Sequence, residues 1–261
     1  MKHNLFIVAL FLFLLFIILF NIYYLTYYAN FNILDIEMVV SRYNEDLQWL
    51  KTNPFDNYPA VIYNKGPNDN IDKTIKNITK IVKIKNVGRE AHTYLYHIIE
   101  NYYNLAEITL FLPGSIPNGH KYNKAKVLIE NIEIHRDTVF VGSKRTDMKG
   151  DEYGTTLNSW DATDPTNNDI NSEHALKPSS IRPFGKWVEE HFPNVISTTT
   201  SGFSIIGIAR RDIIQHPIEY YKKIIKELEN SSNPETGHYF ERAWFAVFYP
   251  YKNLKHVSSH W

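Results

Sequence analysis

The residues best placed to do chemistry begin with Arg89 and Glu90, which follow a glycine in the segment 86–103, NVGREAHTYLYHIIENYY. Apolar residues recur along this segment at helical spacing, so it predicts an amphipathic helix. Glu90, Tyr94 and His97 share a second, polar face that can line a cleft. The free backbone N–H groups at the start of a helix, beside Arg89, suit a phosphate or another anion. A surface helix with a polar outer face is the alternative interpretation.

A second charged helix is predicted for the segment 237–248, GHYFERAWFAVF. His238, Glu241 and Arg242 share one face of it, and mainly apolar residues form the other face. Charged residues within so aromatic a helix indicate a buried ion pair or a cleft. Alternatively, Glu241 and Arg242 anchor a neighbouring loop and have only a structural role.

Proton transfer is the chemistry that the histidines and glutamates of these two helices could perform. An imidazole or a carboxylate within reach of a hydroxyl group can take its proton and so make the oxygen a nucleophile. The candidate catalytic residues are His97, Glu100, His238 and Glu241.

A loop rich in polar side chains follows the first predicted strand, 33–40. Open α/β sheets bind ligands where a buried strand ends in such a loop. Its candidate substrate-binding residues are Arg42, Asn44, Glu45 and Asp46. The guanidinium group of Arg42 can pair with a diphosphate, and the other three side chains can hold a base or a ribose. Alternatively, Asn44 or Asp46 caps a short helix at 47–51.

Two aspartates in the long polar segment 142–182 are candidate metal ligands. Asp161 and Asp164 offer the oxygen atoms that magnesium or manganese prefers, and long irregular loops in compact domains are often functional. The alternative for both residues is ordinary turn and cap chemistry.

The elements that must position these residues alternate between strands and helices. The predicted strands are 33–40, 60–63, 78–84, 108–112, 139–141 and 202–209. The predicted helices, besides the two charged ones, are 47–51, 124–131, 183–192 and 213–229. This order predicts βαβ units, and therefore an α/β fold with a single mixed, mostly parallel sheet flanked by helices.

Composition limits the classes of function that the 261-residue sequence can have. It contains 28 Lys and Arg and 28 Asp and Glu, so the net charge is zero. That balance argues against a nucleic-acid-binding protein that neutralises many phosphates. No cysteine is present, which excludes disulfides, a Cys-x-x-Cys metal site and thiol catalysis.

An apolar segment at 5–25 predicts a membrane anchor. It has no charged residue and the length of a membrane-spanning helix, and four tyrosines follow it where an aromatic belt would lie. A cleaved signal peptide is the alternative, but no small-residue cleavage pattern follows the segment. Lys2 precedes the span and no Lys or Arg follows it before Arg42. The positive-inside rule therefore predicts a single-pass type II protein with a lumenal or extracellular domain.

The expected organisation along the chain has five parts. These are a short cytoplasmic tail at 1–4, a transmembrane anchor at 5–26, a stem at 27–35, an α/β domain at 36–250 and a C-terminal tail at 251–261. Two N-x-[ST] sequons, at Asn77 and Asn230, are compatible with a glycoprotein whose domain is lumenal. The lipid bilayer is thus the first expected partner.

Four longer motifs carry a resemblance to a known family: VVSRYNEDLQWL, IYNKG, NVGREAHTYLYHIIENY and GHYFERAWFAVF. They resemble an uncharacterised domain-of-unknown-function family typified by ARYNED, NVGREAHTYLxHI and HxFERxW, over residues 38–248. That family is similar to glycosyltransferases of the GT-A arrangement, the nucleotide-diphospho-sugar transferase type, in which one α/β sheet binds a nucleotide sugar. The resemblance implies a nucleotide-sugar donor and a glycan or protein acceptor. Arg89, Glu90 and Arg242, from the two charged helices, complete the substrate-binding candidates.

One departure from the GT-A pattern concerns the metal. Such enzymes commonly carry Asp-x-Asp at the end of a central strand, where it binds a divalent cation and the diphosphate. Here the strand 108–112 is followed by Pro-Gly-Ser, so no carboxylate stands at that point. A manganese or magnesium cofactor thus has no Asp-x-Asp site. Arg42, Arg89 and Arg242 could instead neutralise a leaving diphosphate.

The sequence therefore predicts a membrane-anchored glycosyltransferase-like protein that transfers a sugar from a nucleotide sugar to an acceptor. A catalytically inactive, membrane-tethered binding or structural protein of the same fold is the alternative. A hydrolase with paired carboxylates ranks last, because the adjacent Glu45 and Asp46 would diverge in a strand-like loop. Convergence of the charged candidates in one cleft favours the enzyme, and scattering over the surface favours the binding protein.

Overall fold

The computed structural model describes residues 13–21, 35–142, 152–157, 174–195 and 204–258. The chain divides into two compact units, Met1–Leu34 and Asp35–Trp261. In the first unit, residues 13–21 are helical, and most of the expected anchor and stem lie outside the described residues. No helix within the described ranges combines the length and the apolar character that crossing a membrane requires.

The second unit is built on one sheet of seven strands in the order β3-β2-β1-β4-β6-β5-β7. The strands are β1 (Ile36–Arg42), β2 (Ala60–Asn64), β3 (Ile78–Lys83), β4 (Ile108–Pro113), β5 (Val139–Gly142), β6 (Ile206–Ala209) and β7 (Lys255–Ser258). β1 is parallel to β2 and β4, β2 is parallel to β3, and β5 is parallel to β7, whereas β6 is antiparallel to both of its neighbours. The predicted α/β fold with a mixed, mostly parallel sheet is confirmed.

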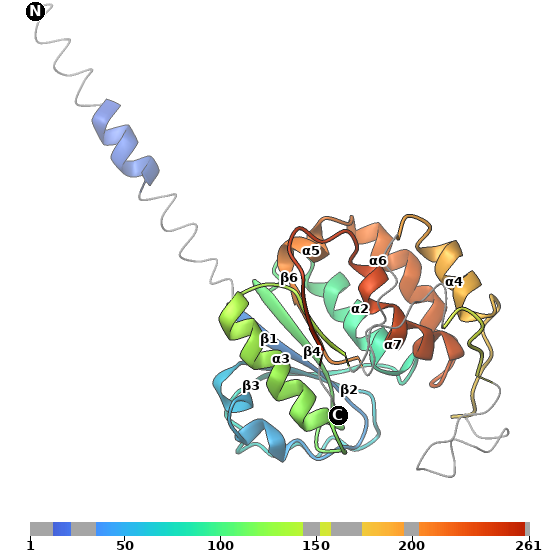
Figure 1. The fold of residues 1–261 in the computed structure, drawn as a ribbon. Helices are drawn as coiled ribbons and strands as arrows, with labels where there is room; N and C mark the ends of the chain where they lie inside the picture. The colour runs from blue at the N-terminus through green and yellow to red at the C-terminus, as the bar shows by residue number, and fades with distance from the viewer. Residues whose placement is uncertain (1–12, 22–34, 143–151, 158–173, 196–203, 259–261) are drawn as a thin grey trace, which may run out of the picture. The chain divides into compact units, whose positions relative to one another are not determined.

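Helices cover both faces of this sheet (Figure 1). The α-helices are α2 (Arg89–Asn101), α3 (Lys121–His135), α4 (Phe184–His191), α5 (Arg210–Ile214), α6 (Ile218–Ile224) and α7 (Glu235–Val247). The part of the chain that the structure describes also has three short 3-10 helices, η1 (Gln48–Lys51), η2 (Phe55–Asn57) and η4 (Ile225–Leu228). In β1, Val39 packs into the core under α2 and α7, whereas Met38 and Val40 pack into the core on the side of α3. The alternation of side chains along each strand thus gives the sheet two buried faces.

The carboxyl ends of β1, β2 and β4 meet at one edge of the sheet. Arg42 is the register partner of Asn64, and Ser41 is the partner of Pro113. A Cβ atom on Gly66 would lie 1.6 Å from the carbonyl oxygen of Tyr43, so only a glycine lets the two loops approach this closely. The loops that follow β1, β2 and β4 are therefore close enough for their side chains to line the same cavity.

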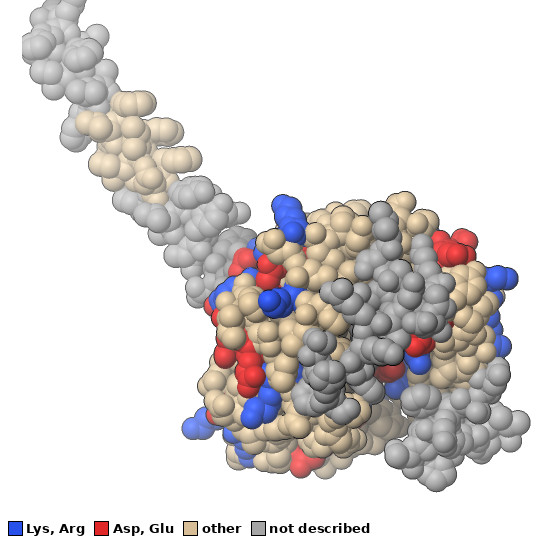
Figure 2. Space-filling model, viewed as in Figure 1, with Lys and Arg blue, Asp and Glu red and all other residues tan. Residues whose placement is uncertain are grey.

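The segment that was expected to be a C-terminal tail contributes to the sheet. Lys255–Ser258 forms β7, which pairs with β5. On the face of the molecule seen in Figure 2, Lys and Arg are interspersed with Asp and Glu, as expected for a chain with no net charge.

The polar face that the sequence analysis assigned to α2 was wrong for its middle turns. Tyr94 and His97 are almost completely buried, with 0% and 1% exposure, and both lie in the core rather than in a cleft. The reason is that α2 is covered by α6, η4 and α7 as well as by the sheet. Tyr94 keeps its hydroxyl satisfied by donating a hydrogen bond to the carbonyl of Ser204.

Candidate active site

A cavity of about 530 Å³ lies at the carboxyl edge of the sheet. The loops after β1, β2 and β4 line it together with the first turn of α2, one turn of α7 and residues 232–233. Six of the residues predicted from sequence lie in its wall: Arg42, Asn44, Glu45, Arg89, Glu90 and Glu241. Parallel strands place their carboxyl ends together, so this is the edge where an open α/β sheet can bind a ligand.

Arg42 is the best fixed cation of this cavity. Its side chain is only 3% exposed. Nε donates to the carbonyl of Glu45 at 3.0 Å, and Nη1 donates to Asn64 Oδ1 at 2.9 Å and to the carbonyl of Asn68 at 2.7 Å. These acceptors are neutral, so the positive charge of Arg42 has no carboxylate within these bonds to balance it. An anion in the cavity would meet a guanidinium group that is already oriented.

Lys65, which the sequence analysis did not single out, is a second buried cation in the wall. It is 7% exposed, and its ammonium group donates to the carbonyls of Val87 and Arg89. Burial lowers the pKa of Lys65 to about 7, while Glu90 raises it and Arg89 lowers it further. Lys65 directly follows β2, so the argument used for Arg42 after β1 would have found it.

The first turn of α2 is held in an unusual backbone conformation. Gly88 and Arg89 both have positive φ angles, of 62° and 52°. A Cβ atom on Gly88 would lie 2.5 Å from Leu228 Cβ, so the close contact with η4 requires glycine. Arg89 is a non-glycine residue in the left-handed region, which costs about 1 kcal/mol or more and is typical of functional sites.

The first two backbone N–H groups of this turn, those of Gly88 and Arg89, are not available to the anion that the sequence suggested. The N–H of Gly88 donates to the carbonyl of Ser231 at 2.8 Å, and that of Arg89 donates to the carbonyl of Ser232 at 3.3 Å. Since these donors already have acceptors, positive charge in the cavity comes from the side chains instead.

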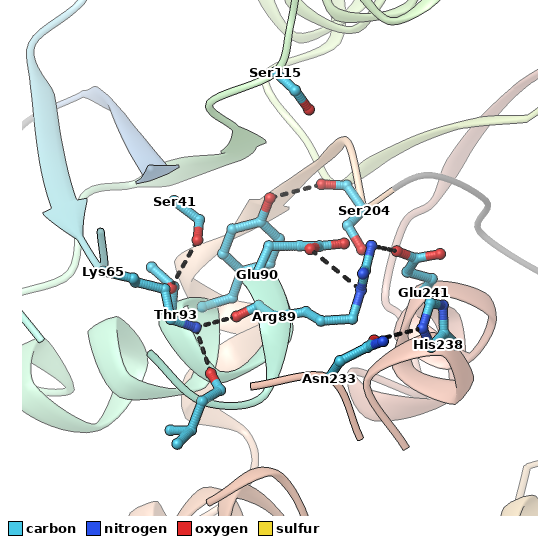
Figure 3. A network of polar contacts seen from close by, with 12 residues as sticks. Ser41, Lys65, Arg89, Glu90, Thr93, Ser115, Ser204, Asn233, His238 and Glu241 are labelled. Carbon is cyan, nitrogen blue, oxygen red and sulfur yellow. Dashed lines mark hydrogen bonds and ion pairs between the residues drawn. The ribbon is translucent and has the colours of Figure 1, made fainter. Parts of the chain in front are cut away.

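Arg89 brings together two glutamates from different helices. Its Nη2 lies 3.3 Å from Glu241 Oε1 on α7, and its Nε lies 3.9 Å from Glu90 Oε2. The side chain of Arg89 lies against Gly237 of α7, where a Cβ atom would lie 3.1 Å from Arg89 Cδ, so a larger residue there would push this side chain aside. In Figure 3 the guanidinium group lies between the two carboxyl groups.

Glu90 and Glu241 also form a hydrogen bond with each other. Their side chains are 14% and 19% exposed. Burial, and then the charge of Glu90, raise the pKa of Glu241 well above its usual range, although Arg89 opposes the shift. Burial also acts to raise the pKa of Glu90, but Arg89 and the hydrogen bond from Glu241 outweigh it and lower that pKa. Two carboxyl groups this close cannot both be ionised at low cost, so their contact favours a form in which the pair shares one proton.

Helix α3 supplies further positive charge beside this pair. Lys121 Nζ donates to Ser115 Oγ at 2.9 Å, and both residues line the cavity. Lys124, one turn further on, is 1% exposed, and burial lowers its pKa to about 7 although Glu241 raises it. Sequence analysis missed Ser115 and Lys121 because only the tertiary structure turns the start of α3 towards the ends of β1 and β2.

In the loop after β1, the side chains of Glu45 and Asp46 accept hydrogen bonds from nearby backbone N–H groups and so stabilise the turn. Glu45 Oε2 accepts from the backbone N–H of Tyr43 at 2.6 Å and from that of Asn44 at 3.1 Å, which closes the turn. Asp46 Oδ1 accepts from the N–H of Gln48 at 3.0 Å. Asp46 is absent from the cavity wall, and its bond to Gln48 forms a local turn just before η1, whose N-cap residue is Leu47 and has no side-chain cap.

On α7, His238 and Arg242 are absent from the cavity wall. His238 is 1% exposed and its Nε2 is 3.0 Å from Asn233 Oδ1, and burial, then the charge of Arg89, lower its pKa to about 3. Arg242 Nε donates to Glu152 Oε2 at 3.3 Å, so this side chain anchors the neighbouring loop. Of the two interpretations of this helix, the anchoring of a neighbouring loop therefore applies to Arg242, and the lining of a cleft applies to Glu241.

His97 and Glu100 lie outside the cavity, contrary to the sequence analysis. His97 Nδ1 is 3.0 Å from Tyr63 Oη, and Nε2 is 3.6 Å from Glu37 Oε2. Burial lowers the pKa of His97 to about 3. Glu100 is exposed on the last turns of α2. Neither side chain can reach a ligand bound at the carboxyl edge of the sheet.

The structure assigns no place to a divalent cation within the ranges it describes. No group of three or more His, Asp or Glu side chains among the described residues has the geometry to hold a metal ion. Asp161 and Asp164 lie outside the described residues. The carboxylates that the cavity does contain are engaged with Arg89 or with backbone N–H groups.

The comparison with protein families gives one result. The profile of the family described as Protein of unknown function (DUF3431) matches residues 38–259. The chain belongs to this family. The match begins within β1 and includes β7, so the whole described sheet falls almost entirely inside it. No curated protein matches the chain.

Proposed function

We propose that the cavity binds a nucleotide sugar and that the protein is a glycosyltransferase. The observation that carries the proposal is the convergence of Arg42, Lys65, Arg89 and the Glu90–Glu241 pair in one cavity at the carboxyl edge of the sheet. These residues come from four segments far apart in the sequence, and a shared structural role would not require all of them to face the same open space. Positive charge surrounds a place where a diphosphate can lie, and a carboxyl pair stands next to it.

The chemistry follows from those groups. Arg42 and Lys121 would stabilise the negative charge that develops on the diphosphate as its bond to the sugar breaks. Glu241, when ionised, would take the proton of an acceptor hydroxyl group, whose oxygen forms the new bond to the sugar carbon. The electron pair of the broken bond leaves with the nucleoside diphosphate. A metal, where one is needed, would add to the same charge stabilisation.

The membrane topology belongs to the proposal as well. An anchor at 5–26 would place a lumenal or extracellular domain after a stem that ends where β1 begins. The apolar, uncharged character of that segment and the absence of basic residues between it and Arg42 support this arrangement.

A binding experiment tests the proposal. Stabilisation of the purified domain by UDP-glucose, GDP-mannose or ADP-glucose, with and without manganese, is measured by thermal unfolding. We expect at least one of them to raise the Tm by about 3 °C or more. Lys121→Met should weaken the binding, and Lys126→Met on the same helix, which does not line the cavity, is the matched control. Absence of any shift from all the donors would contradict the proposal.

A catalytically inactive binding protein is the second candidate. It is favoured by one observation, namely that three of the four predicted catalytic residues, His97, Glu100 and His238, are absent from the cavity wall. The two candidates differ in turnover. With a donor that binds, the enzyme releases nucleoside diphosphate in the presence of acceptor glycans, and the binding protein does not.

A further inference from the structure

The Glu90–Glu241 pair faces positive charge from every element around it. The ionisable groups that interact with the pair are Lys65 after β2, Arg89 and Tyr94 on α2, Lys121 and Lys124 on α3, and His238 and Arg242 on α7. Arg89 has the shortest ion-pair distances, of 3.3 Å to Glu241 and 3.9 Å to Glu90. Any ligand that draws on this positive charge must compete with the two glutamates for it.

We propose that the cleft binds a phosphate-bearing ligand together with one proton, which is held between Glu90 and Glu241. The inference rests on the proposed function only for the class of ligand, and sugar transfer is not needed for it. It assigns the carboxyl pair the role of a proton site that is coupled to the anion site.

A bound phosphate favours protonation of the Glu90–Glu241 pair for two physical reasons. A phosphate bound beside the pair places negative charge close to both carboxyl groups, which disfavours the ionised form of the second glutamate. If the phosphate also accepts hydrogen bonds from Arg89, the pair loses the guanidinium group that favours ionisation. Both changes stabilise the protonated pair, so ligand and proton bind more tightly together than separately.

Among the carboxyl groups of the cavity wall, the geometry restricts this effect to the pair. The two side chains belong to different helices, are each less than one-fifth exposed and are bonded to one another. Glu45, the other carboxylate in the wall, accepts hydrogen bonds from two backbone N–H groups and so keeps its charge balanced inside its own turn. Burial already raises the pKa of Glu241, which brings the titration of the pair into the range of physiological pH.

We expect the affinity for the phosphate-bearing ligand to fall as the pH rises. Where the free pair is already protonated, the affinity should be constant. As the pH rises past the titration of the free pair, the affinity should fall by up to about tenfold per pH unit, the limit for one linked proton. Net proton uptake should accompany binding in that alkaline range.

The test uses isothermal titration calorimetry with whichever of ADP-glucose, UDP-glucose or GDP-mannose binds. These diphosphate esters have no phosphate group that titrates near neutral pH, so any proton taken up belongs to the protein. Titrations at about pH 8 in two buffers of different ionisation enthalpy give the number of protons. We expect uptake for the wild type and for Glu130→Gln, an exposed control on α3, and little or none for Glu241→Gln.

Lys65 and Lys124, whose pKa values burial lowers to about 7, are the other groups whose titration could give the same sign. Lys65→Arg and Lys124→Arg each keep the positive charge but cannot titrate in this range. Uptake that survives in both of these variants and is lost in Glu241→Gln supports the inference. Uptake that persists in Glu241→Gln, or binding with no uptake in the wild type, overturns it while leaving the nucleotide-sugar site intact. Absence of binding by all the donors overturns the proposed function and the inference together.

Discussion

The two ends of α2 carry similar residues and lie in opposite environments. At its start, Arg89 and Glu90 open onto the cavity and meet Glu241 from α7. Two turns later, His97 lies between Tyr63 and Glu37 and is only 1% exposed. Both places contain a titratable group beside a carboxylate. Only the first leaves charged atoms directed at open space.

The difference teaches how to separate a functional polar cluster from a structural one. The His97 cluster is nearly self-contained, because Tyr63 and Asn101 lie close to its Nδ1 and only Nε2 is without a hydrogen bond. In the cavity, the hydrogen bonds of Arg42 and Lys65 go only to neutral oxygen acceptors. The charge of Arg42 is felt by Asp69 and that of Lys65 by Glu90, so a ligand would share these two cations with the carboxylates. The predictions below test this contrast, from the largest expected effect to the smallest.

The largest effect is expected where the two loops of the cavity edge touch. Gly66→Ala would force a Cβ atom to within 1.6 Å of the carbonyl oxygen of Tyr43, so the backbone must shift. We expect a loss of about 3 kcal/mol or more in the free energy of unfolding, together with loss of ligand binding. Urea denaturation measures the first quantity. Gly154→Ala is the control, because no atom lies within 4 Å of the position that its new methyl group would occupy.

The second prediction concerns the enclosed end of α2. His97→Ala removes a buried ring and the partner of the Tyr63 hydroxyl group, so the free energy of unfolding should fall by about 2–3 kcal/mol. Ligand affinity, measured by calorimetry below the unfolding temperature, should be unchanged. Glu100→Gln, on the exposed side of the same helix, should change stability by no more than about 0.5 kcal/mol. A large loss of affinity in His97→Ala would mean that the enclosed cluster serves the cavity after all.

The third prediction is the converse at the open end. Lys65→Met removes a buried charge from the cavity wall, so ligand affinity should fall about tenfold, which corresponds to about 1.4 kcal/mol. Stability should change by about 1 kcal/mol or less, because the loss of two hydrogen bonds is offset by not having to bury an ammonium group. Lys223→Met, exposed on α6, should alter neither quantity. Unchanged affinity in Lys65→Met would remove Lys65 from the site.

The smallest effects are expected in the pH dependence of stability, and the two ends of α2 should differ in sign. His97 has a pKa lowered to about 3 by burial, so the folded state binds fewer protons than the unfolded state below about pH 6.5, and acidification destabilises the fold. Glu241 has a raised pKa, so the folded state holds an extra proton above the unfolded pKa, and stability is lost as the pH rises towards the folded pKa.

Matched variants separate these two contributions. Relative to the wild type, Glu241→Gln should gain stability on going from about pH 5 to about pH 8, by about 1 kcal/mol after allowance for partial exposure. His97→Phe should instead flatten the acid side of the profile. Urea denaturation across this range checks both. Identical profiles for Glu241→Gln and the wild type would show that Glu241 is ionised in the folded protein.

Local pattern was enough to predict most of the elements. The apolar runs of β1, β2 and β4 and the periodicity of α7 follow from burial of short stretches of chain, and the structure places Phe240, Ala243 and Trp244 of α7 in the core as expected. The strand β7 was missed because Lys255–Ser258 has no apolar run and is a strand only because β5 offers it an edge. The enclosure of His97 was also missed, since helical spacing shows which residues share a face but not how many neighbours cover it.

By itself, the sequence determined that strands end in charged loops and that Arg42, Arg89 and Glu241 stand where parallel strands or charged helices could present them. Only the tertiary structure decided which of these side chains meet. Glu90 and Glu241 are far apart along the chain, and they meet because α2 packs against α7 and the Arg89 side chain lies beside both. Local periodicity fixes which way a side chain points within one helix, whereas the crossing of two helices depends on the shape of every residue between them.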